Sequence, residues 1–507
     1  MPILPHNNLE FKMVFISLNA EIKTPLFQQV FNQLKDKIDK QLLPPGYKLP
    51  STRSLAQKLG VDRTTIYKAY QELWALGYID SRSGSYSYVR QKRELCNTKQ
   101  KIESSLIAWN TKVNDSAEKV YKMFGEINYP FSEKTVKFEG IDLGRLHPDT
   151  RLYPIEKFKS CLNKVLLESG HQVLDYGNTL GHLPLRDFIA RRQQMHGINT
   201  KTEEVIITNG AQNAIDLLMK LFAKPGARVF VESPTYGMII PTLHYYQCEI
   251  VSIPMREDGV DLKIIEQELK KGKPIFFYTM PNFHNPTGIT TSQKHRENLL
   301  ALFESYGVPI IEDAFEEEMK YFGKVPLPIK SMDNNRIVIY VGSFSKILFP
   351  GIRLGWITAD NEIIKRLASI KRFSDLTSAL PEQAALAEFC AQGYYELQIK
   401  KIHKIYRKRM AAAVNVLSQR IQNKNVTWNQ PNGGFTIWIT LDNCHKNYSE
   451  VNNILLDSNV RFALGKDFFP HNEKNIFLRL SIASLNEDEI TEGINRFAKS
   501  LNRIYEK

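Results

Sequence analysis

The sequence predicts two folded regions of different class, a small helical domain with a β-hairpin, followed along the chain by a larger α/β domain. Residues 24–76 show the pattern of helices joined by short turns, and residues 77–89 show that of a hairpin. From residue 204 onward, short runs rich in Ile and Val alternate with amphipathic helices, which is typical of strands in a parallel sheet covered by helices. The chain has 507 residues, 43% of them hydrophobic, so it can bury several cores.

The helices of the first region are predicted from the signals at their ends. Thr24 is expected to cap a helix that has Pro25 in its first turn and an apolar stripe on one side. A second, short helix is expected over residues 51–59 with a serine as its cap. A third is expected over residues 62–76 with an aspartate as its cap. This spacing is that of a helix-turn-helix unit.

The third helix has two unlike faces. Ile66, Ala69, Tyr70 and Leu73 recur at helical spacing and are expected in the core. The opposite face is polar and cationic and has the width of a DNA groove. Residues 77–89 then read as two strands with a Ser-Gly-Ser tip, so a wing is expected beside the helices.

Positive charge is concentrated in this first region. The whole chain carries a formal net charge of +13. Residues 23–93 alone hold 13 Lys and Arg against five Asp and Glu. Dense positive charge of this kind favours salt-dependent binding to phosphates, although scattered solvated lysines are the usual reason for a basic chain.

Two short motifs make the first region similar to a known family. Residues 49–53 read Leu-Pro-Ser-Thr-Arg, and residues 63–65 read Arg-Thr-Thr. With the hairpin, they resemble the GntR family of winged-helix regulators over about 65 residues. The resemblance implies binding to double-stranded DNA, although a winged helix can also serve in dimerisation or protein docking. The resemblance and the cationic face together give these candidate DNA contacts: Arg53, Arg63, Thr64, Thr65, Tyr67, Lys68, Ser83 and Gly84.

In the α/β region, Lys346 is the candidate for covalent chemistry. It follows residues 336–341, an Ile- and Val-rich run expected to be a strand buried on both faces. Ligands of open α/β sheets bind at the carboxyl ends of strands, and a lysine among apolar groups loses proton affinity and can form a Schiff base. Arg353 follows seven residues later and can clamp a phosphate. A surface lysine is the commoner meaning of this short motif alone.

Three further strand ends carry matching groups. A strand over residues 204–208 leads through Asn-Gly into a helix at 211–222, which offers backbone N–H groups to a phosphate. Asn285, in an Asn-Pro-Thr-Gly turn, follows a strand at 274–279, and Asp313 follows a strand at 308–312. With Lys346, these groups resemble in type and order the fold type I pyridoxal-phosphate (PLP) enzymes, the aspartate aminotransferase superfamily. The resemblance extends from about residue 140 to the C-terminus, with a large and a small subdomain.

That resemblance implies PLP as cofactor and gives each matching residue a role. Lys346 would form the Schiff base, Asn285 would bind the phenolic oxygen and Asp313 would pair with the pyridine nitrogen. Tyr236 would stack on the ring, and Arg479 would bind the carboxylate of an effector or substrate. Tyr176 would reach the phosphate of a partner subunit, which implies a dimer. The other residues expected to bind the cofactor are Gly210, Ala211, Gln212, Ser343, Ser345 and Arg353.

Together, the two regions resemble the MocR family of bacterial regulators over residues 23–507. Its members bind PLP, respond to an amino compound or to PLP itself, and are usually head-to-tail homodimers. In this sequence Phe315 stands where the family commonly has a tyrosine, which weakens the case for efficient turnover. The alternatives are an active aminotransferase with a DNA-binding appendage and a PLP-free scaffold, which the sequence disfavours because Lys346, Asp313 and Arg353 are all present.

Composition and spacing set the remaining expectations. No apolar run approaches the roughly 20 residues of a membrane span, and no secretion signal is evident, so a cytoplasmic location is expected. The five cysteines are far apart and lack zinc-site spacing, so no metal site is expected. The predicted domain bounds are a leader at 1–22, the winged helix at 23–90, a linker at 91–139 and the PLP domain at 140–507.

Overall fold

The computed structural model describes residues 16–19, 21–81, 86–90, 107–125, 138–315, 318–323 and 326–506. The chain forms two compact units, Met1–Trp109 and Asn110–Lys507, and each is described by itself. Among the described residues, the apolar stretches within helices fall short of what a membrane crossing requires.

The first unit is a helical domain with a short antiparallel hairpin, as predicted. Its elements are α1 (Leu26–Asp39), α2 (Thr52–Leu59), α3 (Arg63–Ala75), β1 (Ile79–Ser81) and β2 (Ser87–Val89). Ser51 caps α2 by accepting a hydrogen bond from the backbone of Ser54. The predicted caps at Thr24 and Asp62 are wrong in detail, because α1 begins after Pro25 without a side-chain cap and the Asp62 side chain makes no capping hydrogen bond. The hairpin tip lies outside the described residues.

The two faces of α3 separate as predicted. Ile66, Ala69, Tyr70 and Leu73 are buried and form one core with α1 and α2. The hydroxyl of Tyr70 donates a 2.9 Å hydrogen bond to the carbonyl of Pro50, which ties α3 to the start of α2. The opposite face of α3 is left open to solvent.

The second unit is built on a mixed sheet in the spatial order β4-β11-β10-β9-β8-β5-β6-β7. β11 pairs antiparallel with both β10 and β4, so the prediction of a parallel sheet holds for the central strands and fails at β11. Its strands are β4 (Val205–Thr208), β5 (Arg228–Ser233), β6 (Glu249–Arg256), β7 (Gly259–Val260), β8 (Phe276–Thr279), β9 (Ile310–Asp313), β10 (Val338–Ser343) and β11 (Gly355–Thr358).

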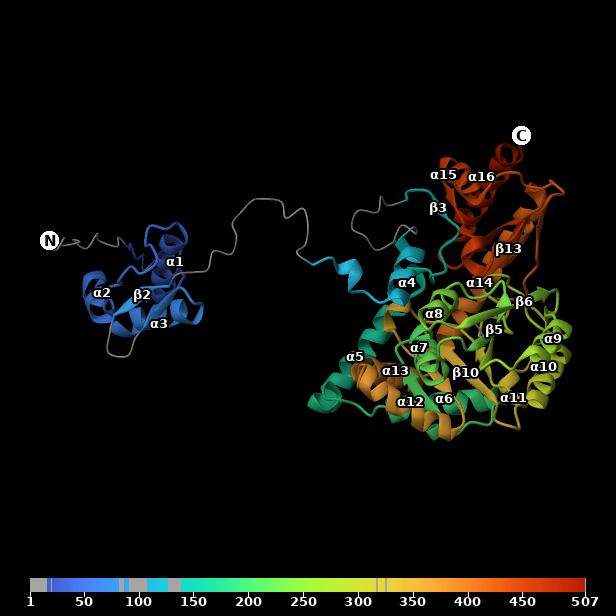
Figure 1. The fold of residues 1–507 in the computed structure, drawn as a ribbon, viewed down its shortest axis with the longest axis horizontal. Helices are drawn as coiled ribbons and strands as arrows, with labels where there is room; N and C mark the ends of the chain where they lie inside the picture. Colours follow the sequence, from blue (N-terminus) through green and yellow to red (C-terminus); the bar gives the residue numbers. More distant parts are fainter. Residues whose placement is uncertain are drawn as a thin grey trace. The chain divides into compact units, whose positions relative to one another are not determined.

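Helices cover both faces of this sheet (Figure 1). One face packs against α7, α8 and α12, and the other against α9, α10 and α11. The covering helices are α7 (Ala211–Phe222), α8 (Ile239–Tyr245), α9 (Leu262–Lys271), α10 (Gln293–Tyr306), α11 (Ile329–Met332) and α12 (Asn361–Ser374). Because both faces are covered, β8, β9 and β10 are buried throughout, as their run of apolar residues predicted.

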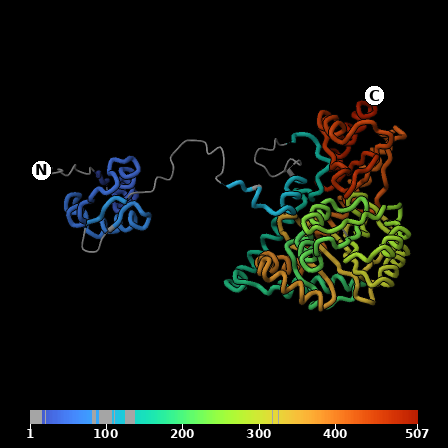
Figure 2. Tube along the Cα trace, viewed as in Figure 1, coloured from blue at the N-terminus to red at the C-terminus, as the bar shows by residue number. Residues whose placement is uncertain are grey.

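The C-terminal part of the second unit forms a smaller subdomain, the red end of the tube in Figure 2. Its antiparallel sheet has the order β12-β13-β16-β15, and β3 pairs with β14 beside it. Residues 382–420 have the sequence pattern of one helix, but the helix is broken at Gly393, whose φ of 70° separates α13 (Leu380–Ala391) from α14. Its elements are α14 (Tyr394–Arg420), β12 (Val426–Trp428), β13 (Thr436–Leu441), α15 (Tyr448–Asp457), β14 (Val460–Arg461), β15 (Ala463–Leu464), β16 (Ile476–Ser481) and α16 (Glu487–Tyr505).

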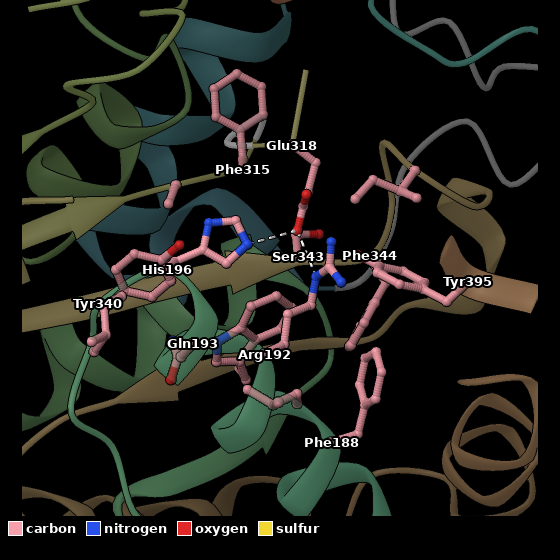
Figure 3. Close-up of a pocket in the computed structure, with 15 residues that line it drawn as sticks. Phe188, Arg192, Gln193, His196, Phe315, Glu318, Tyr340, Ser343, Phe344 and Tyr395 are labelled. Atoms are coloured by element: carbon pink, nitrogen blue, oxygen red, sulfur yellow. Dashed lines mark hydrogen bonds and ion pairs between the residues drawn. The ribbon is translucent and has the colours of Figure 1, made fainter. Parts of the chain in front are cut away.

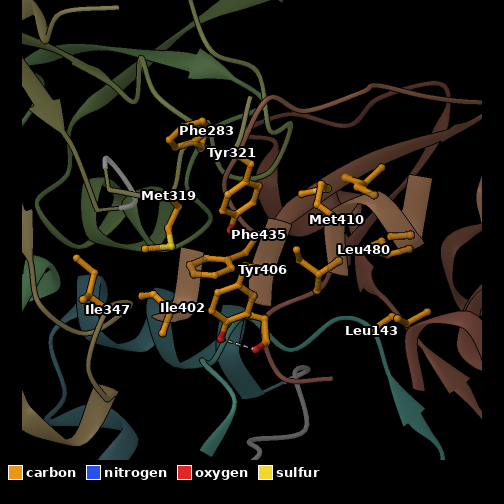
Figure 4. Packing of buried hydrophobic residues seen from close by; sticks show 14 of the residues in the cluster. Leu143, Phe283, Met319, Tyr321, Ile347, Ile402, Tyr406, Met410, Phe435 and Leu480 are labelled. Atoms are coloured by element: carbon orange, nitrogen blue, oxygen red, sulfur yellow. Dashed lines mark hydrogen bonds between the residues drawn. The ribbon is translucent and has the colours of Figure 1, made fainter. Parts of the chain in front are cut away.

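One apolar core joins the two subdomains (Figure 4). Tyr406 of α14 packs edge-to-face on Phe435, and the same cluster includes Ile347, next to the candidate lysine, and Leu143. Remaining elements of this unit are α4 (Asp115–Gly125), β3 (Ile141–Asp142), α5 (Ile155–Ser169), α6 (Leu183–Met195), α13 (Leu380–Ala391) and the short 3-10 helices Thr150–Leu152, Gly170–Leu174, Thr202–Glu204, Pro350–Ile352 and Gly465–Phe468. A further 3-10 turn, Trp109–Thr111, spans the boundary between the two units.

Candidate functional site

The start of α7 and Arg353 form an anion-binding corner at one edge of the main sheet. Gly210 stands at the N-cap of α7 with a φ of 88°. Arg353 donates a 2.9 Å hydrogen bond from Nη2 to the carbonyl of Asn209. A Cβ on Gly210 would lie 3.0 Å from that nitrogen, so glycine lets the guanidinium lie against the turn. A helix N-terminus and a guanidinium side by side suit a phosphate.

A second layer of polar groups holds this corner in place. Asn209 donates from Nδ2 to Asp375 Oδ2 at 2.8 Å. Lys371 is fully buried and donates to both oxygens of Asp375 and to Ser378. Sequence reasoning missed this support, because it joins the end of α12 to a turn more than 160 residues earlier.

Asp313 is buried at the end of β9 and is held from the adjacent strand. The hydroxyl of Tyr278 on β8 donates a 2.6 Å hydrogen bond to Asp313 Oδ2. The other oxygen, Oδ1, is buried and has no hydrogen-bond partner among the described residues. Burial raises the pKa of Asp313 to about 6, while the Tyr278 hydroxyl and the backbone N–H of Phe315 act in the opposite direction. One oxygen is therefore fixed and the other is left for a ligand.

Tyr236 and Asn285 are two further residues predicted to bind the cofactor. Tyr236 lies close enough to Asp313 and Arg353 for their charges to act on its pKa, which burial raises. Asn285 is buried and accepts a 2.8 Å hydrogen bond from Arg479 Nη1. The structure therefore places Arg479 of the small subdomain next to the Asn-Pro turn of the large one.

The Asn-Pro turn is anchored by two buried ionisable groups that sequence reasoning missed. Arg296 of α10 is fully buried and donates to the carbonyl of Pro281 and to Asn282 Oδ1. His284 Nε2 lies 3.1 Å from Oε2 of Glu232, and Oε1 of the same carboxylate accepts a hydrogen bond from the Thr279 hydroxyl. The fixed turn defines the position of Asn285.

Lys346 follows β10 and faces a segment from the start of the domain. Its Nζ donates a 2.5 Å hydrogen bond to the carbonyl of Leu146. The backbone N–H of Ser345 donates to Ser343 Oγ at 3.2 Å, which shapes the loop between strand and lysine. Gly144, two residues before Leu146, accepts a 2.8 Å hydrogen bond from Arg479 Nη2 through its carbonyl. The segment Gly144–Pro148 is thus part of the site, although nothing in the sequence pointed to it.

A small cavity lies beside the lysine loop, between α6 and the segment after β9 (Figure 3). Arg192 of α6 donates from Nε to Glu318 at 2.6 Å, and His196 Nε2 lies 3.7 Å from the same carboxylate. Phe315 and Ser343 also line the cavity. This ion pair ties Glu318 to α6.

Some predicted residues lie apart from this cluster. Tyr176 is 78% exposed and does not lie at the anion-binding corner of its own chain. Gln212 donates to Thr242 Oγ1 at 3.1 Å, and its own Oε1 is buried without a partner among the described residues. Ala211 begins α7. In the described parts of the chain, no group of His, Cys, Asp and Glu is arranged to hold a metal ion.

The candidate DNA contacts lie on the open face of the first unit. Arg53, Arg63, Thr64, Tyr67 and Lys68 are exposed and Thr65 is half-buried. Arg63 Nε lies 3.4 Å from Thr52 Oγ1, so α2 and α3 present their polar groups together. Ser83 and Gly84 lie outside the described residues.

Two family models match the chain. The model described as aminotransferase class I and II matches residues 143–497, and the model described as bacterial regulatory proteins of the gntR family matches residues 26–89. The first match covers more than half of the chain.

Individual relatives and solved structures agree with these matches. The uncharacterized HTH-type transcriptional regulator YdfD of Bacillus subtilis is 30% identical over 93% of this chain and 95% of its own length. Aromatic-amino-acid aminotransferase 1 of Thermococcus litoralis is 33% identical over 71% of this chain and 87% of its own length. The crystal structure of LysN, the α-aminoadipate aminotransferase of Thermus thermophilus, has a TM-score of 0.72 and 29% identity, and covers 78% of this chain and 99% of its own.

Proposed function

The chain belongs to the aminotransferase class I and II family and carries a GntR-type DNA-binding domain, the architecture of MocR regulators, and we propose that its aminotransferase-like domain senses an amino compound. It is a transcription regulator by its domain composition and by its full-length relatives. The observation that carries the proposal is that one chain holds both an exposed cationic α3 face and a site with the half-buried Lys346, the buried Asp313 and the exposed Arg353.

The site fits pyridoxal phosphate, the cofactor of this family. The corner of Gly210 and Arg353 would hold the phosphate, and the unpartnered Oδ1 of Asp313 would hold the ring nitrogen. Tyr236 and Asn285 would hold the ring and its phenolic oxygen. When bound, the cofactor supplies an aldehyde that condenses with amines and a ring that withdraws electrons.

The residues of this chain would position the reacting amine, a negative charge and the ligand's carboxylate. Lys346 brings its amine to the carboxyl end of β10, and Leu146 orients that amine through its carbonyl. Asp313, held by Tyr278, keeps a negative charge in a buried place, where its interaction with a cationic ring is strong. Arg479 would bind the carboxylate of an amino acid, after the ligand displaces the carbonyl of Gly144 or the side chain of Asn285.

Sensing is favoured over turnover by residue 315. Phe315 has no hydroxyl to donate to the cofactor's phenolic oxygen, so Asn285 is left to hold that oxygen. The second candidate function is an active aminotransferase with a DNA-binding appendage. It is favoured by the 33% identity with an aromatic-amino-acid aminotransferase, which covers 71% of this chain.

A homodimer is part of the proposal. Large apolar side chains are exposed on the second unit, and the aminotransferase fold is typically dimeric. Tyr176 on this surface would reach the phosphate of the neighbouring subunit in a head-to-tail pair. The exposed residues that support such an interface are Leu167, Leu174, Tyr176, Leu183 and Phe373. Because the regulator acts on DNA, we place it in the cytoplasm.

One set of measurements tests the proposal. Full-length protein is loaded with PLP, reduced with borohydride and mapped by mass spectrometry. Label on Lys346 supports the site, whereas label on Lys371, a fully buried lysine of α12, would contradict it. Operator affinity is then measured with and without PLP and candidate amines, in wild type and Lys346→Ala. Ligand-dependent affinity in wild type alone supports sensing. Equal affinity in every state, together with multiple turnovers of an amino donor and a keto acid, would favour the enzyme instead.

A further inference from the structure

The segment Gly144–Pro148 connects the small subdomain to the lysine. Its start is fixed in the small subdomain, because β3 pairs with β14 and the carbonyl of Leu143 accepts a hydrogen bond from the backbone of Ser481. The carbonyl of Gly144 then reaches Arg479 and the carbonyl of Leu146 reaches Lys346. Arg145 and His147 therefore lie on a segment that touches both groups expected to bind an amino acid, and His147 is near enough to Lys346 and Arg479 to feel their charges.

The charged groups around His147 are positive. The charged neighbours that act on His147 are Lys346, Arg145 and Arg479, and all are cations. Desolvation is the larger cause and these cations are the smaller one, and together they lower the pKa of His147 to about 4, so the ring is neutral near pH 7. Its Nδ1 then accepts the 3.0 Å hydrogen bond from Arg145 Nε, which holds the Arg145 side chain beside the site.

Among the described residues and the groups of the proposed ligand, no negative charge remains to pair with Arg145. The cofactor phosphate would pair with Arg353, its ring nitrogen with Asp313, and an amino acid's carboxylate with Arg479. Asp467 is a further carboxylate near Arg479. Among the described residues, no carboxylate forms an ion pair with Arg145, and the Arg145 side chain donates a hydrogen bond to His147. Its guanidinium is exposed and free to take a ligand group.

We propose that Arg145 binds a second anionic group on the effector, so the effector is an amino acid whose side chain ends in a carboxylate or a similar anion. This inference rests on the proposed sensing function and narrows it to a chemical class. A guanidinium is suited to the purpose because its fork matches a carboxylate in two parallel hydrogen bonds. A neutral side chain of equal length would leave the Arg145 charge unmatched and gain nothing from it.

Matched pairs of ligands test the proposal. PLP-loaded full-length protein is titrated with L-glutamate and L-glutamine, and with L-2-aminoadipate and L-norleucine, while the absorption spectrum of the bound cofactor is followed. The expected result is at least about ten-fold tighter binding of the anionic member of a pair, because a charge-assisted bidentate contact is at stake. Arg145→Gln should lower the affinity for the anionic ligands by a similar factor and leave the neutral ones unchanged.

Controls separate this proposal from the sensing function itself. Arg145→Lys should restore part of the preference, and Arg420→Gln, which removes an exposed arginine of α14, should change nothing. Spectral responses to neutral amino acids alone, or equal losses for both members of a pair in Arg145→Gln, would overturn the role of Arg145 while sensing stands. No spectral response to any amine, with operator affinity unaffected, would instead refute the sensing function.

Discussion

The hydroxyl of Tyr278 donates a 2.6 Å hydrogen bond to Asp313 from the neighbouring strand. Parallel pairing aligns Tyr278 with Ile311, two residues before Asp313, so the long tyrosine side chain reaches diagonally across the pair to the carboxylate. Tyr278 therefore fixes the direction of the Asp313 carboxylate, the group that we propose for the cofactor ring, and favours its charged form.

Tyr278→Phe should weaken PLP binding without unfolding the protein. The hydroxyl stabilises the ionised carboxylate, so its loss raises the pKa of Asp313 further and frees the side chain to rotate. A hydrogen bond to a charged group contributes about 1.5–3 kcal/mol, so PLP affinity should fall by about ten-fold or more. Titration of apo-protein with PLP, followed by fluorescence, measures this. Tyr406→Phe, which removes the hydroxyl that donates to Ala483, is the matched control and should leave PLP affinity unchanged.

Asp313→Asn should stabilise the apo-protein while it weakens cofactor binding. Burial raises the pKa of Asp313 from an ordinary 3.8 to about 6, so the folded state holds its proton more tightly than the unfolded state. The free energy of unfolding therefore falls as pH rises from about 4 to 6 and is lower by about 3 kcal/mol above that range. Urea unfolding of apo wild type and variant at pH 4 and pH 7 tests this. A stability gain of equal size at both pH values would show that the ionisation of Asp313 is not the cause.

Phe315→Tyr should increase turnover if the missing hydroxyl limits it. The added group can donate a hydrogen bond to the phenolic oxygen of the cofactor, which lies near Asn285 in the proposed site. We expect a change in the absorption maximum of the loaded protein and a faster half-reaction with an amino donor, by about ten-fold or more for one charge-assisted hydrogen bond. Stopped-flow absorption measures both. Unchanged spectrum and rate would mean that residue 315 does not reach the cofactor.

Arg63→Ala should weaken operator binding by about ten-fold or more, because a base-reading arginine contributes about 1–3 kcal/mol. Specificity should relax at the same time. The measurement is fluorescence anisotropy with operator and scrambled duplexes at several salt concentrations. Lys40→Ala removes an equal charge at the end of α1 and should have a smaller effect that does not depend on sequence. An intact preference for the operator in Arg63→Ala would place base reading elsewhere.

Sequence alone predicted the elements of the site that follow local rules. The strands that lead to Asn285, Asp313 and Lys346 are buried, as their apolar runs indicated, whereas the roles of Asn285 and Asp313 came from the resemblance to a known family. The faces of α3 followed from helical spacing in the same way. These features depend on neighbours within a few residues.

The missed features depend on residues far apart in the chain. The contact between Tyr278 and Asp313 depends on strand register, which no single strand reveals. Lys346 and Leu146 are 200 positions apart, and only the closed fold brings them together. The break at Gly393 was missed because helical pattern continues on both sides of it, and a glycine within such a pattern is a weak signal.

β11 lies between β4 and β10 in the main sheet, and Arg353 closely precedes it in the chain. The anion-binding corner can therefore form only after this late part of the chain has been synthesised. Gly210 follows β4 and Arg353 precedes β11, so the corner needs two pieces of chain that leave the ribosome more than 140 residues apart. The winged helix is complete by residue 89 and is available to fold long before. At translation rates of about 5–20 residues per second, the DNA-binding unit of a nascent chain precedes its cofactor site by on the order of tens of seconds. A newly made chain therefore completes its DNA-binding unit before the site that we propose for the cofactor.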